Sequence, residues 1–300
     1  MKFSYRFPGE FKNFKVFGYL LVIITNKRII FYNTEKKEEV LEIIHSLSLL
    51  DLFLYNNEIY LVGKTMLYKI QDIKIYQDTI KEMKITDRTN YKLSLFFNQQ
   101  KIIPNDFSLE ISGEATKSYE KYYSIKDSLN IINVLELETF SVCTVFLDQI
   151  VVANIHGIFF YNDKFQRTKE IPLNDGICTK LLVKDKLYLS FENGTLYSYD
   201  TKLNIIIKMD DIIISFDIGD IFILGMFNMK IYRNKKILNL NRKIRGVKIL
   251  DDKIIVYEDY ILILNQNLEI EEDIKKKLLS IEEYGGKVYL VYENKIEEFL

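Results

Sequence analysis

The hydrophobic pattern of the chain repeats one unit: a short apolar run, a small turn and a second apolar run. SFENGTLYSYD (190–200) shows it most plainly, because apolar and polar side chains alternate on both sides of Asn193-Gly194. A period of two predicts half-buried β-strands, and an Asn-Gly turn between two such runs predicts a hairpin. The same unit recurs at 19–33, 58–70, 149–162, 186–200, 220–234, 253–265 and 287–300, with a weaker version at 91–112.

The spacing of these hairpins predicts a β-propeller. Their turns lie roughly 38 residues apart on average, which fits four short strands joined by tight turns. In most repeats a further apolar strand precedes the hairpin, and a more polar strand follows it. This gradient is typical of a propeller blade, whose outer strand faces water. We therefore predict an all-β fold, a single propeller of four-stranded blades.

The number of blades depends on how the middle of the chain is divided. Eight hairpins favour eight blades, whereas reading 64–156 as one blade with a long insertion gives seven. The last hairpin lacks a fourth strand, and MKFSYRF (1–7) is an alternating strand with no repeat of its own. We predict a single domain over 1–300 in which 1–7 completes the last blade and closes the ring, so that no sheet edge is left exposed.

The third strand of several repeats resembles that of a WD40 repeat, in which a turn with glycine leads to a strand ending in Trp-Asp. Tyr199-Asp200, Tyr32-Asn33 and Tyr161-Asn162 stand at those two positions, and Tyr232-Arg233 is a more diverged version. The chain has no tryptophan, and no Gly-His pair opens its repeats, so the hydrogen-bond network of that family is not implied. The resemblance implies a degenerate WD40-like or quinoprotein-like propeller and, with it, a scaffold for protein interactions.

Composition gives no sign of a nucleic-acid-binding or membrane protein. The chain has 41 basic and 42 acidic residues, so its net charge favours neither kind of partner. The apolar run at 16–25 is followed by NKRIIFYN, not by a small-residue cleavage site, and no run is long enough to span a membrane. Cys143 and Cys178 lie in apolar runs without CxxC spacing, which predicts buried free thiols in a reducing compartment. We expect an intracellular protein, cytoplasmic or nuclear.

No group of residues has the pattern of a catalytic or metal site. His45 and His156 lack partners at ligand spacing, and the acidic runs fall at turns and outer strands. The sequence has no P-loop, dinucleotide fingerprint or nucleophile elbow. We therefore predict no catalytic residue, metal, cofactor or small-molecule substrate. A propeller enzyme, with a site assembled from loops of several blades, is the less favoured alternative.

A basic stretch, NRKIRGVK (241–248), is the first candidate for binding. Its KIRG resembles the Arg-Arg-Gly signature of phosphoinositide-binding propellers, with one arginine where that signature has two. A linker between two blades accounts for the stretch and is the favoured interpretation, and binding of phosphoinositide or RNA is the alternative function. The residues that would carry this binding are Arg242, Lys243, Arg245 and Lys248.

The segment around 112–128 is the second candidate, because it interrupts the repeat and is predicted to be a loop insertion. Tyr119, Tyr122 and Tyr123 cluster within it, and exposed aromatic side chains are effective anchors for a protein partner. A solvated loop without a function is the alternative. The function we predict is a non-catalytic scaffold that binds other proteins of a larger intracellular complex.

Overall fold

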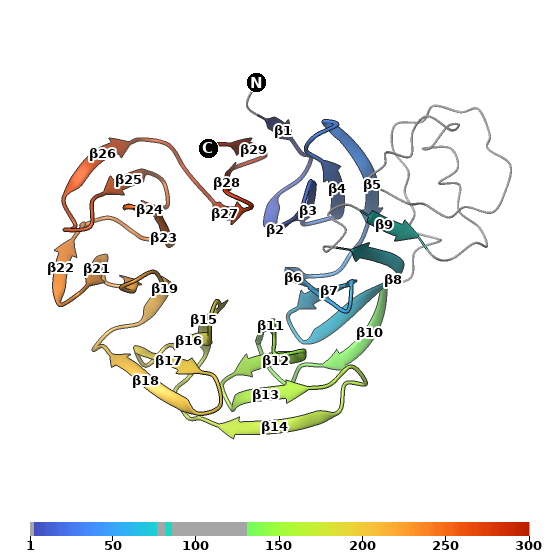
Figure 1. Ribbon diagram of the computed structural model, residues 1–300, viewed down its shortest axis with the longest axis horizontal. Coiled ribbons are helices and arrows are strands. Elements are labelled where there is room, and N and C mark those ends of the chain that lie inside the picture. The colour runs from blue at the N-terminus through green and yellow to red at the C-terminus, as the bar shows by residue number, and fades with distance from the viewer. Residues whose placement is uncertain (1–2, 77–81, 86–130, 300) are drawn as a thin grey trace, which may run out of the picture. The chain divides into compact units, whose positions relative to one another are not determined.

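A computed structural model of the chain describes residues 3–76, 82–85 and 131–299, and all regular elements in these ranges are β-strands (Figure 1). By their contacts the residues divide into two compact units. The first consists of Met1–Leu137, Glu282–Tyr289 and Asn294–Leu300, and the second of Glu138–Ile281 and Leu290–Glu293. The described residues include no helix long and apolar enough to cross a membrane.

The first unit contains two complete antiparallel sheets, each with its strands paired in order. One sheet consists of β2 (Phe11–Phe17), β3 (Leu20–Thr25), β4 (Arg28–Asn33) and β5 (Glu38–Ile44). The other has the order β6-β7-β8-β10, and a short strand, β9, also pairs with β8. Its strands are β6 (Leu49–Tyr55), β7 (Glu58–Gly63), β8 (Met66–Tyr76), β9 (Glu82–Ile85) and β10 (Ile131–Glu136).

The second unit contains four antiparallel sheets, each a four-stranded meander. The first strands of successive sheets, β11, β15, β19 and β23, contact one another, and the fourth strands lie on the outside of the unit (Figure 1). The sheets consist of β11 (Val142–Phe146), β12 (Gln149–Asn154), β13 (Gly157–Tyr161) and β14 (Arg167–Pro172); β15 (Cys178–Val183), β16 (Leu187–Phe191), β17 (Thr195–Tyr199) and β18 (Leu203–Lys208); β19 (Ile213–Asp217), β20 (Ile223–Met226), β21 (Lys230–Arg233) and β22 (Lys236–Asn239); and β23 (Gly246–Leu250), β24 (Lys253–Tyr257), β25 (Ile261–Leu264) and β26 (Ile270–Ile274).

The seventh sheet joins the two ends of the sequence. Its order is β1-β29-β28-β27, with β27 at Ser280–Tyr284, β28 at Lys287–Tyr292, β29 at Lys295–Glu298 and β1 at Ser4–Arg6. Tyr5 faces Ile296 in the antiparallel pairing of β1 with β29, so the N-terminal strand supplies the fourth strand of this sheet. Closure of a ring, the stronger prediction, is not supported, because the contacts of β1 lie within the first unit.

The described residues form seven sheets, and the prediction of eight blades is wrong. The difference arises at β8, which pairs on one side with β7 and on the other with β10, over fifty residues further along the chain. The strand at 131–136 therefore completes the second sheet and does not open a new one. The weak hairpin predicted at 91–112 lies outside the described residues.

Burial follows the predicted gradient in the second unit, where the two middle strands of each sheet form the core. All five residues of β16 and of β17 are buried, whereas β26 is exposed throughout. The fourth strand of the first unit's opening sheet differs, because Val40, Leu41 and Ile43 of β5 are buried in an apolar cluster. Both cysteines are buried free thiols, as predicted.

The sequence predicts two-residue turns between the first two strands of several repeats, and those at 56–57, 251–252 and 285–286 are present. The one predicted at 184–185 is a three-residue loop, because Val183 pairs with Leu187. Asn56 and Asn57 both have positive φ, the geometry that asparagine tolerates best among residues with a side chain. The apolar run SVCTVFL (141–147) predicts a turn at Asp148-Gln149, whereas the structure places it at Leu147-Asp148. The register explains this shift, because Phe146 pairs with Gln149 and leaves 147 and 148 as the loop.

The Asn193-Gly194 turn requires its glycine. Gly194 has a φ of +80°, and a Cβ there would lie 2.3 Å from the carbonyl oxygen of Met209 and 2.6 Å from that of Asp211. We expect Gly194→Ala to lower the free energy of unfolding by about 3 kcal/mol, because it adds backbone strain to a clash with two carbonyl groups. Urea denaturation would measure this.

Gly285→Ala is the matched control for that substitution. Gly285 has a φ of +58°, and a Cβ there would meet nothing within 4 Å. This variant should therefore lose only the backbone term, about 1 kcal/mol. Equal losses in the two variants would contradict the steric explanation.

Candidate binding cleft and adjoining polar network

Polar side chains connect the first strands of neighbouring sheets in the second unit. Thr179 Oγ1 in β15 donates a hydrogen bond to the carbonyl oxygen of Ile213 in β19, at 2.6 Å. The backbone N–H of Val247 in β23 donates to Ser215 Oγ in β19, at 3.2 Å. The first strand of a sheet would otherwise leave one edge unpaired. These side chains therefore form hydrogen bonds with backbone groups of the first strands that have no partner in a neighbouring strand.

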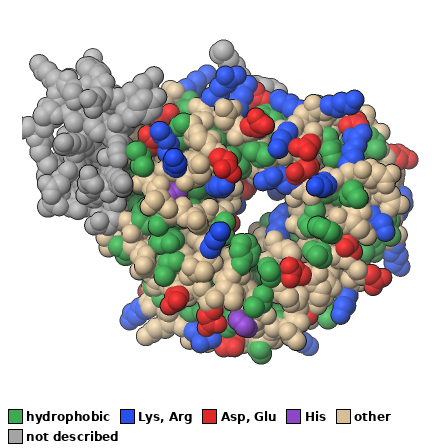
Figure 2. Space-filling view, turned by 180° about the vertical axis from the view of Figure 1, so that it is seen from behind, with side chains coloured by type: hydrophobic (Ala, Val, Ile, Leu, Met, Phe, Trp, Pro, Cys, Tyr) green, Lys and Arg blue, Asp and Glu red, His purple; other side chains and the backbone are tan. Residues whose placement is uncertain are grey.

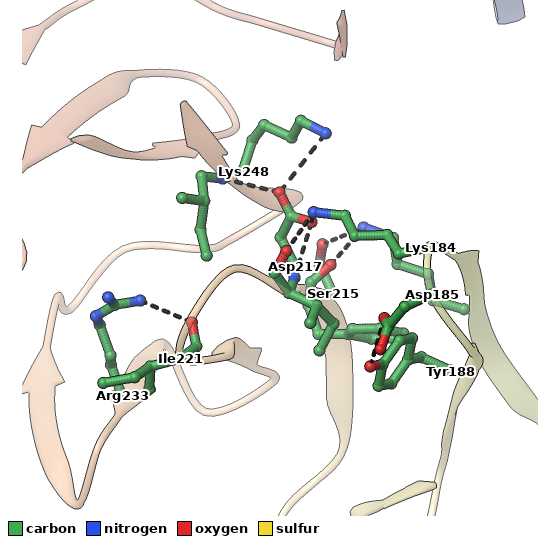
Figure 3. A network of polar contacts seen from close by, with 12 residues as sticks. Lys184, Asp185, Tyr188, Ser215, Asp217, Ile221, Arg233 and Lys248 are labelled. Carbon is green, nitrogen blue, oxygen red and sulfur yellow. Dashed lines mark hydrogen bonds and ion pairs between the residues drawn. The ribbon is translucent and has the colours of Figure 1, made fainter. Parts of the chain in front are cut away.

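Asp217, the last residue of β19, is the centre of this network (Figure 3). Its side chain is buried and accepts hydrogen bonds from the N–H of Ile218 at 2.8 Å and of Ile249 at 2.9 Å. It also forms ion pairs with Lys184, at 3.2 Å, and with Lys248, at 3.6 Å. One carboxylate thus joins three successive sheets.

The charge state of Asp217 follows from these contacts. Burial by itself would raise its pKa, but Lys248, the N–H of Ile249, Lys184 and the N–H of Ile218 together outweigh burial and lower the pKa. A third ammonium group lies beside the pair, because Lys180 Nζ donates to the carbonyl oxygen of Phe216 at 2.8 Å. The cluster holds an ionised carboxylate among lysines, which is the chemistry of a structural link.

The first unit has a comparable link between β2 and β6. Asn13 Nδ2 donates to Asp51 Oδ1 at 2.7 Å, and Lys15 forms an ion pair with Glu282 of β27 at 2.8 Å. Burial raises the pKa of Asp51, and the charge of Lys15 opposes this shift. Polar bridging between first strands is therefore a feature of both units.

A cleft of about 610 Å³ lies beside the Asp217 network, between the sheets β19–β22 and β23–β26. The turns that follow β19, β21, β23 and β25 contribute to its walls. Asp220 comes from the first of these turns, Lys236 follows the second, and Asp251 and Asp252 form the third. The cleft is thus built by turns of two neighbouring sheets, and its wall carries charges of both signs.

Arg233, the last residue of β21, lines this cleft and is only 7% exposed. Its Nη1 donates to the carbonyl oxygen of Ile221 at 3.0 Å (Figure 3), and its Nη2 donates to Oε1 of Gln266. Burial lowers the pKa of Arg233, and the carboxylate of Asp220 opposes this shift. The guanidinium forms no ion pair with a carboxylate of the described residues.

The position of Arg233 in its repeat explains why its side chain is available. At the corresponding place in four other repeats, an Asn or Asp side chain accepts N–H groups of the following turn; these residues are Asn33, Asn162, Asp200 and Asn265. Guanidinium has no acceptor and cannot cap a turn in this way. Asn234 and Lys235 form a tight turn with positive φ at both residues instead. An arginine where other repeats have Asn or Asp was the sequence signal for this site.

The residues predicted from the basic stretch do not form a free cationic surface. Arg242 pairs with Asp273 at 2.8 Å, and its guanidinium also lies over the ring of Tyr260. Arg245 lies 4.0 Å from Glu258, and Lys248 belongs to the Asp217 network. For Lys243, the contact in the structure is through the backbone, since its carbonyl oxygen accepts the hydroxyl of Tyr260 at 2.6 Å. Three of the four positive charges therefore have a carboxylate partner.

The remaining candidates lie elsewhere. Tyr119, Tyr122 and Tyr123 lie outside the described residues. His45 is buried, and burial lowers its pKa, while its Nδ1 accepts the N–H of Leu47 at 3.2 Å. His156 is exposed at the turn between β12 and β13. Among the described residues, no group of three or more His, Cys, Asp and Glu side chains is placed to hold a metal ion.

Comparison with known proteins identifies the fold. No protein-family model and no curated protein matches the sequence. Among solved structures, the chain is similar to the WD40 β-propeller domain of Doa1, with a TM-score of 0.62 and 9% identity over 100% of this chain and 96% of that one. It is also similar to the CNH domain of AfRom2, with a TM-score of 0.60 and 9% identity over 99% of both chains.

A third similar structure is Raptor from Chaetomium thermophilum, with a TM-score of 0.63 and 9% identity over 98% of this chain. The chain spans 28% of the length of Raptor. Together with the seven sheets, these similarities identify the fold as an all-β propeller of the WD40 type with seven four-stranded blades. The resemblance inferred from the third strands of the repeats is therefore confirmed.

Proposed function

We propose that the protein is a non-catalytic scaffold for protein interactions and a subunit of a larger intracellular assembly. The observation that carries this proposal is the cleft of about 610 Å³ between two blades, built by turns and lined by charged and amide side chains. Turns on a rigid sheet framework are common places for binding residues. The WD40-type fold supports an interaction scaffold at the same coarse level.

The surface charge favours a protein partner over a polyanion. On the face that Figure 2 shows, Lys and Arg side chains are interspersed with Asp and Glu, and hydrophobic side chains lie between them. A basic face, such as nucleic acid or an anionic membrane attracts, would need unpaired cations gathered on one side. The carboxylate partners of Arg242, Arg245 and Lys248 work against such a face.

Affinity purification of the tagged chain, followed by mass spectrometry, tests the proposal. We expect a reproducible set of co-purifying proteins, and we expect it to be unchanged when Arg242, Lys243 and Arg245 are all replaced by Gln. Glutamine avoids placing new negative charge beside Asp273 and Glu258. If no protein co-purified specifically with the tagged chain from the cells that produce it naturally, this result would contradict the proposal.

The same triple variant tests the alternative function. We expect neither the wild type nor the variant to bind RNA or phosphatidylcholine vesicles that contain phosphatidylinositol phosphate. If the wild type bound either one in a salt-sensitive way and the variant did not, the basic stretch 241–248 would be the functional site.

A further inference from the structure

We propose that the cleft around Arg233 binds a single Asp or Glu side chain of an extended segment in a partner protein, with Lys or Arg residues beside that carboxylate. This inference rests on the proposed function and specifies its site and the chemistry of the partner. It is carried by the buried guanidinium, by the charges of the cleft wall and by the size of the cleft.

The guanidinium of Arg233 has the donors and the fixed orientation that suit a carboxylate. It has five N–H donors in a fixed fork, and the two acceptors that hold it, a carbonyl oxygen of Ile221 and Oε1 of Gln266, are neutral. These two contacts fix its orientation, and neither neutralises its charge. A buried cation is costly, and Asp220 offsets part of this cost without forming an ion pair with Arg233. An incoming carboxylate that accepts two parallel N–H groups would relieve the remainder.

The wall of the cleft selects a single negative charge over several. Asp220, Asp251 and Asp252 line the cleft together with Arg233 and Lys236. Asp252 also forms an ion pair with Lys253, at 3.6 Å, so the wall carries three carboxylates, one of them already paired with a cation outside the wall. A phosphate or a run of acidic residues would be repelled by the three carboxylates. One carboxylate on Arg233, flanked by Lys or Arg side chains that meet the aspartates, matches this arrangement.

The dimensions fit a peptide. About 610 Å³ lies within the range of pockets that enclose a small ligand, roughly 300–1,000 Å³, which is enough for one or a few side chains of a peptide. The amide side chain of Asn234, in the wall, offers a donor and an acceptor to a peptide backbone. The amide of Gln266 is already bonded to Arg233 and to the carbonyl oxygen of Asp252. Lys236 Nζ donates to Oδ1 of Asn267 at 3.0 Å, and both residues line the cleft.

A phage-displayed library of random 12-residue peptides, selected on the full chain, tests the inference. We expect the selected peptides to share one Asp or Glu with Lys or Arg nearby. Arg233→Gln should weaken them about tenfold or more, because a charge-assisted bidentate contact is lost. Arg242→Gln, which removes an exposed arginine outside the cleft, is the matched control and should bind as the wild type does.

A double variant tests the cleft without altering the buried Arg233. Asp251→Asn with Asp252→Asn alters only exposed side chains, and it should tighten binding of the selected peptides once their Lys and Arg residues are replaced by Ser. Selected peptides without an acidic residue, an empty selection, or affinities equal in the Arg233→Gln variant and the wild type would each overturn the inference. The co-purifying proteins would still be found in these cases, so failure of the cleft is distinguishable from failure of the scaffold proposal.

Discussion

Replacing Asp217 by Asn is expected to lower the free energy of unfolding by about 3 kcal/mol, because it removes one partner from a buried ionic group. Asn keeps one acceptor for the N–H groups of Ile218 and Ile249, but its NH₂ group brings new donors toward lysines. Urea denaturation monitored by far-ultraviolet circular dichroism would measure the loss.

Asp200→Asn is the matched control. The Lys186–Asp200 ion pair, at 3.1 Å, is almost the same length as the Lys184–Asp217 pair, at 3.2 Å, but both of its side chains are exposed. Exposed pairs contribute little to stability, and Asn retains the acceptor that caps the turn after β17. We expect this variant to unfold at the urea concentration of the wild type. Equal losses in the two variants would show that burial of Asp217 is not the source of its effect.

The Asp217 variant also predicts a change in pH dependence. Because the pKa of Asp217 is lower in the folded protein than in the unfolded chain, its contribution is fully present above the unfolded value of about 3.9 and is lost as the pH falls through the folded value. The difference in stability between wild type and Asp217→Asn should therefore shrink below about pH 4. A difference that stayed constant down to pH 2 would contradict the ionised state of this carboxylate.

Local patterns in the sequence were sufficient to predict strands and turns, since these depend on neighbouring residues. Alternation around Asn193-Gly194 predicts a hairpin, and β16 and β17 form it. The number of blades depends on a different kind of contact. Pairing of β8 with β10 joins residues separated by the whole stretch 77–130, and a repeat period alone does not predict a pair that crosses such a stretch.

The binding residues were harder to predict, because the side chains that form ion pairs with them come from strands distant in the sequence. The basic stretch has four cations in eight positions, but Asp273, Glu258 and Asp217 approach it from distant parts of the chain and neutralise three of them. Arg233 belongs to no recognised motif, and the lysines at 230, 235 and 236 do not set it apart. Its departure from the Asn or Asp of other repeats was visible, whereas the turns of two sheets that surround it became apparent only in the folded chain.

Deleting residues 1–7 is expected to have the largest effect, because this segment carries two buried aromatic side chains and a strand. Phe3 and Phe7 are each 3% exposed, and the ring of Phe3 lies 5.3 Å from that of Tyr32. Loss of a buried Phe costs about 3–5 kcal/mol, so the loss of two approaches the whole stability of an ordinary domain, about 5–15 kcal/mol. We expect the shortened chain to be largely unfolded or aggregated at room temperature, as judged by circular dichroism and light scattering.

A double point variant separates the two contributions of residues 1–7 to stability, which are burial of the aromatic side chains and pairing of the strand. Phe3→Ala with Phe7→Ala keeps the backbone hydrogen bonds, including the one from the N–H of Phe7 to the carbonyl oxygen of Asn294, at 3.0 Å. This double variant should therefore be destabilised without exposing the edge of β29, and it should aggregate less than the deletion. Phe227→Ala, at a side chain that is 67% exposed, is the control and should unfold as the wild type does. If the deletion left the urea midpoint unchanged, the N-terminal strand would contribute nothing to its sheet, and the pairing of Tyr5 with Ile296 would have no energetic meaning.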